Sequence, residues 1–123
     1  MASELLLTLL QLQNQMKLYH RQTELHSRHI ASDKFLGKYT EILDKLIEAY
    51  QGRYGIIRVK NTNSIKISNI PDDKIIDFLK KMRDYLTDIA PKLFNKNKNG
   101  DLFNLRDEML ESIDNTIYLF NQR

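Results

Sequence analysis

Two histidines and three carboxylates of this chain are spaced so that they could bind a metal ion. His29 and Asp33 are one helical turn apart. Asp44 and Glu48 repeat this spacing later in the same predicted helix, and His20 lies upstream. Imidazole and carboxylate groups together suit iron, zinc or manganese. Thiolate sites and disulfides are excluded, because the chain contains no cysteine.

The four ligands on the predicted second helix cannot all bind one ion within one chain. His29, Asp33, Asp44 and Glu48 share a sector of about 100° beside the apolar stripe, at about 100° per residue. Along the helix axis, however, His29 and Glu48 are about 28 Å apart at about 1.5 Å per residue. A metal ion needs its donors at about 2 Å. The pattern therefore predicts two half-sites.

A twofold dimer would bring the two half-sites together. If the second helix packs antiparallel against its own copy, His29 and Asp33 of one chain meet the other chain's half-site. The midpoint lies near residues 38–39, between Gly37 and Thr40, which are small enough for close approach. Such an interface is self-complementary and creates two equivalent sites. Without metal, the same pattern would form a polar dimer seam or a solvated flank.

Four stretches with apolar residues at helical spacing predict the scaffold that holds these residues. Gly52 is suited to end the second helix. Pro91 is suited to stop or kink the third, although residues 92–94 could add a turn. Four amphipathic helices in a chain of 123 residues favour an all-α four-helix bundle, in one domain over residues 1–123. The predicted helices cover residues 4–24, 28–51, 71–90 and 102–121.

The connection over residues 53–70 differs from these helices. Ile57 and Val59, then Ile65 and Ile67, alternate with polar residues. This alternation indicates either a small hairpin or a mostly extended crossover between the second and third helices.

The formal net charge of +3 is concentrated in two predicted connections. A basic connection is usually a solvated loop, although it can also contact DNA or another polyanion. The N-terminal region shows neither a signal peptide nor a membrane span, so we expect a soluble, cytoplasmic protein. The basic residues concerned are Arg58, Lys60, Lys66, Lys92, Lys96 and Lys98.

The ligand spacing resembles that of the Dps family, the miniferritins of the ferritin-like superfamily. The resemblance covers residues 18–50 and rests on Leu18-Tyr19-His20 followed by His29-x3-Asp33-x10-Asp44-x3-Glu48. The latter spacing matches the family's ferroxidase signature. Two features depart from the family pattern: a shorter interval between His20 and His29, and Arg21 in place of a tryptophan.

The resemblance implies a ferritin-like bundle with a long crossover, and oxidation of Fe(II) by peroxide or oxygen. His20, His29 and Asp33 of one subunit would bind iron with Asp44 and Glu48 of its partner. The implied assembly is a dodecamer built from such dimers, which stores iron or protects against oxidative damage. The alternative is a non-enzymatic helical-bundle oligomer, structural or associated with nucleic acid, whose metal site is degenerate.

Overall fold

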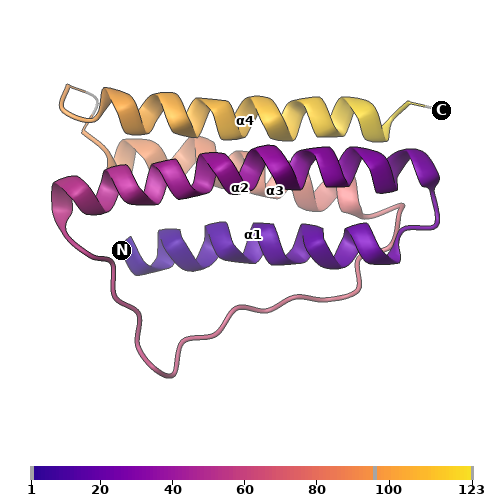
Figure 1. Ribbon diagram of the computed structural model, residues 1–123, viewed down its shortest axis with the longest axis horizontal. Coiled ribbons are helices and arrows are strands. Elements are labelled where there is room, and N and C mark those ends of the chain that lie inside the picture. The colour runs from indigo at the N-terminus through magenta and orange to yellow at the C-terminus, as the bar shows by residue number, and fades with distance from the viewer. Residues whose placement is uncertain (1, 96, 123) are drawn as a thin grey trace.

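The computed structural model describes residues 2–95 and 97–122 and is built from four α-helices (Figure 1). No strand occurs in the described residues, which confirms the predicted all-α class and the number of helices. The connection predicted as a hairpin or a crossover therefore contains no β-hairpin. The helices are α1 (Ala2–Gln22), α2 (His26–Tyr54), α3 (Ile75–Leu93) and α4 (Gly100–Phe120).

The predicted end of the second helix, at residue 51, and the predicted start of the third, at residue 71, were wrong. The second helix does not stop at Gly52 but continues to Tyr54, and Gly55, with φ of 93°, follows it. Glycine suits that position because positive φ is costly for other residues. The third helix begins at Ile75, after a turn that contains Pro71, and extends past Pro91 to Leu93.

The helices form a bundle in which α1 packs on α2, α2 on α4, and α4 on α3. Figure 1 shows α1 and α4 running in one direction and α2 and α3 in the other. The predicted stripes face inward. Leu9, Leu12 and Met16 of α1, for example, are fully buried against the other helices. Burial of each such side chain contributes about 1.5–3 kcal/mol.

Residues 55–74 form a long irregular segment that lies along α1. In Figure 1 it leaves the end of α2, passes beside α1 and enters α3 at the opposite end of the bundle. Its backbone is held by amide side chains of α1. Gln15 donates to the Ser68 carbonyl at 2.7 Å and accepts from the Ser68 amide at 3.0 Å, while Gln11 donates to the Lys66 carbonyl at 3.0 Å.

None of the helices in the described ranges is both long enough and apolar enough to span a membrane.

Candidate functional site

The structure brings His20 and His29 together at the turn between α1 and α2. Their imidazole rings stack with centroids 4.0 Å apart and an interplanar angle of 19°. His20 lies in the last turn of α1, while His29 lies in the first turn of α2. The short turn, Thr23 to Leu25, allows this contact between residues nine positions apart. The two histidines that the resemblance places in one half-site therefore lie together within one chain.

The hydrogen bonds of the two histidines define which ring nitrogen carries the proton. His29 Nδ1 lies 2.9 Å from the main-chain oxygen of His20, which can only accept, so this nitrogen is a donor. Ser32 Oγ donates to the His29 carbonyl at 3.0 Å, and it therefore accepts from His20 Nδ1 at 2.8 Å. In the neutral form, both rings keep an Nε2 lone pair. Metal-binding histidines typically have this arrangement, with the second nitrogen donating to a carbonyl or hydroxyl.

The predicted carboxylate ligands occupy one exposed face of α2. Asp33 lies one turn after His29, whereas Asp44 and Glu48 lie three to four turns further along the helix. All three side chains are exposed. Within residues 2–95 and 97–122, no three histidine or acidic side chains of one chain are close enough to hold a metal ion. The candidate ligands therefore remain two separate half-sites within a chain.

Among the residues that the structure describes, the interior of the bundle offers no second place for such a site. The buried polar side chains of the described residues are amides and hydroxyls, which do not form an iron site by themselves. They are Gln15, Ser32, Asn99, Ser112 and Thr116.

A hydrogen-bonded clasp next to the histidines fixes the ends of the helices. The Tyr19 and Thr23 hydroxyls each donate to Asp72 Oδ1 at 2.6 Å. Arg28 donates through Nε and Nη2 to the Phe120 carbonyl at 3.2 and 3.0 Å, and so joins α2 to the end of α4. Because Tyr19 precedes His20 and Arg28 precedes His29, the clasp holds the backbone next to both histidines.

The clasp also changes the acidity of Asp72. Partial burial acts to raise the pKa of this carboxyl, but the hydrogen bonds from Thr23 and Tyr19, helped by the Arg28 charge, hold the pKa below its ordinary value.

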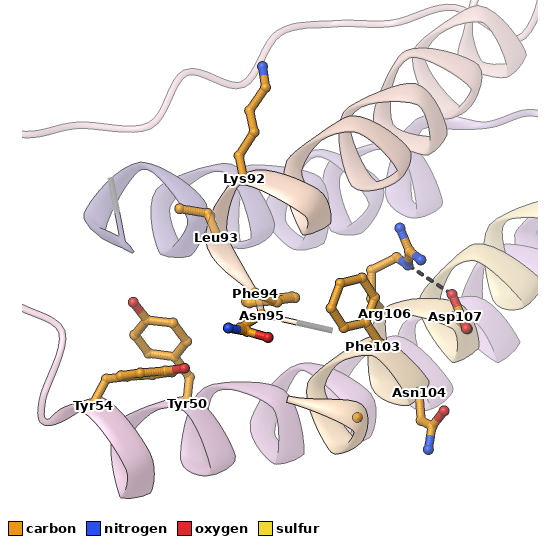
Figure 2. Close-up of a pocket in the computed structure, with 11 residues that line it drawn as sticks. Tyr50, Tyr54, Lys92, Leu93, Phe94, Asn95, Phe103, Asn104, Arg106 and Asp107 are labelled. Atoms are coloured by element: carbon orange, nitrogen blue, oxygen red, sulfur yellow. Dashed lines mark hydrogen bonds and ion pairs between the residues drawn. The ribbon is translucent and has the colours of Figure 1, made fainter. Parts of the chain in front are cut away.

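The sequence interpretation missed a pocket at the other end of the bundle. Figure 2 shows this pocket, where α2 and α3 end and α4 begins. Tyr50, Tyr54, Phe94 and Phe103 line it. Aromatic residues at helical spacing normally indicate core packing, so spacing alone does not reveal the pocket. The sequence contained one signal, because Tyr54 is an aromatic residue that follows the last residue of the predicted core stripe. In the structure its side chain is half exposed.

Comparison with known proteins places the chain in a family. A family model described as a family of unknown function, DUF5856, matches residues 20–120. The matched range includes all five candidate ligands and every residue lining the pocket. No curated protein and no solved structure matches the chain.

Proposed function

This chain belongs to the DUF5856 family, and we propose that it binds and oxidises Fe(II) at sites shared between two copies related by a twofold axis. Each site would combine His20, His29 and Asp33 of one copy with Asp44 and Glu48 of the other. Fe(II) is the substrate, and peroxide or oxygen is the oxidant. Zinc or manganese would fit the same donor set.

The observation that carries this proposal is the geometry of the stacked histidines. Each ring has its Nδ1 proton held by an oxygen, so each neutral ring presents Nε2 as a donor atom. Asp33 lies one turn beyond His29 on the same exposed face and can add a carboxylate oxygen. Two imidazoles and one carboxylate leave coordination positions on iron open, and the carboxylates of a partner could fill them.

The exposed face of α2 is suited to pair with its own copy. His29 and Glu48 share a midpoint between residues 38 and 39, as do Asp33 and Asp44. In an antiparallel pair, each half-site therefore faces the other. The Asp33 carboxylate would meet the Asp44 carboxylate of the second copy, and two facing carboxylates repel each other unless a cation lies between them. A bound metal would thus stabilise both the site and the dimer.

An exposed apolar side chain supports the same pairing. Ile30 is 55% exposed, which is high for an isoleucine in a helix. Ile30 and Ile47 are related by the midpoint that relates the ligands, so an antiparallel pair would bury the Ile30 side chain against the second copy's isoleucine. Gly37, between the half-sites, adds no side chain that would keep the helices apart.

The protein side chains have separate tasks in this reaction. Carboxylates bind Fe(II) and balance its charge, and they favour the more highly charged Fe(III) product. The stacked imidazoles bind the ion through Nε2 and fix its position. Oxidation of two Fe(II) releases two electrons, which one peroxide molecule accepts with two protons to give two waters. The proposal also includes a relationship of this bundle to ferritin-like proteins and the assembly of such dimers into a dodecamer.

Fe(II) oxidation can be measured directly. Purified protein is loaded with Fe(II) anaerobically, peroxide or oxygen is added, and ferric absorbance is followed. We expect Asp44→Ala/Glu48→Ala to reduce the rate at least about tenfold, because it removes one half of every site. Glu108→Ala/Glu111→Ala removes the same charge from exposed positions on α4 and should leave the rate unchanged.

Native mass spectrometry tests the assembly separately. A dimer or larger oligomer that dissociates in chelator would support the shared site. A monomer under all conditions would contradict it, as would equal oxidation rates for the wild type and Asp44→Ala/Glu48→Ala. An oligomer without oxidation would favour the non-enzymatic bundle, with the α2 face serving as a polar seam.

A second candidate function is contact with duplex DNA. Arg58, Lys60 and Lys66 are exposed on the irregular segment, and none of them pairs with a carboxylate among the described residues. Binding to duplex DNA that weakens with salt, and weakens further when these residues are neutralised, would support this function.

A further inference from the structure

The pocket at the end of the bundle is remote from the histidines. It has a volume of about 1030 Å³, which is within the range of small-molecule sites. Tyr50 and Tyr54 come from the end of α2, and Phe103 comes from the first turn of α4. The stacked histidines lie where α1 ends and α2 begins, at the opposite end of α2 (Figure 1).

The pocket has an aromatic wall. The rings of Tyr50 and Tyr54 lie 4.9 Å apart, and Tyr50 is 6.3 Å from Phe94, which contacts Phe103 at 5.8 Å between centroids. In Figure 2 the two tyrosines lie on one side and Phe103 on the other, with Phe94 and Asn95 between them. Tyr54 is 50% exposed, so its ring is available to a planar ligand.

A buried amide holds the exposed ring in place. Asn99 is fully buried, and its Oδ1 accepts hydrogen bonds from the Tyr54 hydroxyl and the Asn95 main-chain amide, both at 2.8 Å. These bonds fix the tyrosine ring and the loop relative to each other. An exposed aromatic ring that is fixed in this way loses little entropy when a ligand stacks on it.

The charges at the pocket favour an anion. Arg106 forms an ion pair with Asp107 at 2.8 Å, lies 5.4 Å from the Phe103 ring centroid, and donates to the Leu86 carbonyl. These two charges offset each other. Lys92 is exposed and forms no ion pair in the part of the chain that the structure describes, so it leaves the pocket with a net positive charge.

We propose that this pocket binds a nucleotide, with the base stacked on the Tyr54 ring and the phosphate near Lys92. Aromatic rings stack with every base, because each base has a π-face. Asn95 lines the pocket, and its Oδ1 accepts a hydrogen bond from the Asn97 main-chain amide at 3.0 Å, so its side-chain NH2 group would be the one to contact the base edge. A quaternary ammonium ligand would also suit aromatic rings, but the positive charge opposes it.

The nucleotide could be free or could be part of a single strand, and binding measurements distinguish the two. The protein has six tyrosines and no tryptophan, so stacking on Tyr54 should quench its tyrosine fluorescence. Titrations in chelator would use adenosine, AMP, ATP and a short single-stranded deoxyadenylate. Tighter binding of AMP or ATP than of the oligonucleotide would identify the ligand as a free nucleotide. Tighter binding of the oligonucleotide than of AMP or ATP would identify the ligand as a base within a single strand.

Matched variants test the ring and the charge. Tyr54→Ala should weaken AMP binding about tenfold, whereas Tyr54→Phe, which keeps the ring, should change it less than about threefold. Tyr118→Ala removes a similarly exposed tyrosine from α4 and is the control. Lys92→Ala should weaken AMP binding but not adenosine binding. Lys80→Ala, at another exposed position on α3, should change neither.

The proposal is independent of the iron site. Asp44→Ala/Glu48→Ala should bind AMP as the wild type does, because both carboxylates lie outside the pocket. Calorimetric binding curves for variants with unchanged melting temperatures would show whether AMP binding depends on Tyr54 and Lys92 but not on the iron ligands. Absence of binding to AMP, ATP and the oligonucleotide at millimolar concentration would overturn it. Equal effects of Tyr54→Ala and Tyr118→Ala would overturn it too.

Discussion

The His20 and His29 rings lie 4.0 Å apart in a stacked arrangement, and each is hydrogen-bonded through Nδ1. The contact joins the last turn of α1 to the first turn of α2. It depends on a short helix-to-helix connection, in which the main-chain oxygen of His20 itself accepts from the second ring. The pair of imidazoles is therefore built into the turn.

Ser32→Ala should weaken metal binding without removing a proposed ligand. The buried Ser32 hydroxyl accepts from His20 Nδ1, and its loss would release the orientation of that ring. We expect metal affinity to fall about 10- to 100-fold, as for other residues that orient a metal ligand. Titration with Co(II) or Zn(II) would measure the change. Ser112→Ala, at a buried serine of α4, is the control, and an equal loss for both variants would contradict the role of Ser32.

Gly37→Arg should prevent self-association and leave the fold intact. A Cβ at Gly37 meets no atom of this chain within 4 Å, so a larger residue fits the isolated bundle. In the proposed antiparallel pair of α2 helices, the same residue would keep the two copies apart. Gly100→Arg makes the same change at an open glycine of α4, outside the proposed α2 interface. Sedimentation should give monomers for the first variant only. A dimer that survives Gly37→Arg would exclude this interface.

Asp72 should make the free energy of unfolding depend on pH in the acid range. Its lowered pKa means that folding favours the carboxylate, so the stabilisation is present above the ordinary value near 3.9 and is lost as pH falls through the lower folded value. Asp72→Asn should reduce the free energy of unfolding by about 1–2 kcal/mol at pH 7. Urea denaturation should show this difference shrinking towards pH 3. Asp73→Asn, at the exposed neighbouring position, should show little change at either pH.

Gln15→Ala should release the irregular segment from α1. Gln15 is 2% exposed and makes two hydrogen bonds with the Ser68 backbone. Its loss should cost about 1–3 kcal/mol and speed amide exchange over residues 55–74. Gln11→Ala removes a single exposed bond to the Lys66 carbonyl and should have a smaller effect. Equal exchange in the two variants would show that Gln15 does not hold the segment.

The helices could be predicted because their apolar residues recur at helical spacing, and those residues form the core. The helix ends were harder to predict, since they depend on local hydrogen bonds. The second helix passes Gly52 because the Gln51 carbonyl accepts from Gly55 N at 2.9 Å, while the Gln51 side chain accepts from Ile57 N at 3.0 Å. Sequence spacing does not indicate which of two nearby glycines follows a helix.

The alternating apolar and polar residues of the connection suggested strands, because their pattern is that of an extended backbone. Alternation shows that the backbone can be extended, but it does not identify the hydrogen-bonding partner. Here amide side chains of α1 take the place of a neighbouring strand. Spacing paired His29 with Asp33, and the family resemblance added His20 to them. The hydroxyl of Ser32 could be recognised only after folding brought it within hydrogen-bonding distance of His20 Nδ1.

The long path of residues 55–74 has an electrostatic consequence for the bundle. Because the segment carries the chain to the far end, α3 starts at the same end as α2, and each helix runs opposite to the helices that it packs against (Figure 1). The peptide dipoles of neighbouring helices then point in opposite directions and partly cancel. A tight turn after α2 would have reversed α3 and, through the short connection that follows, α4 as well, which would have aligned the dipole of α4 with that of α2, its packing neighbour.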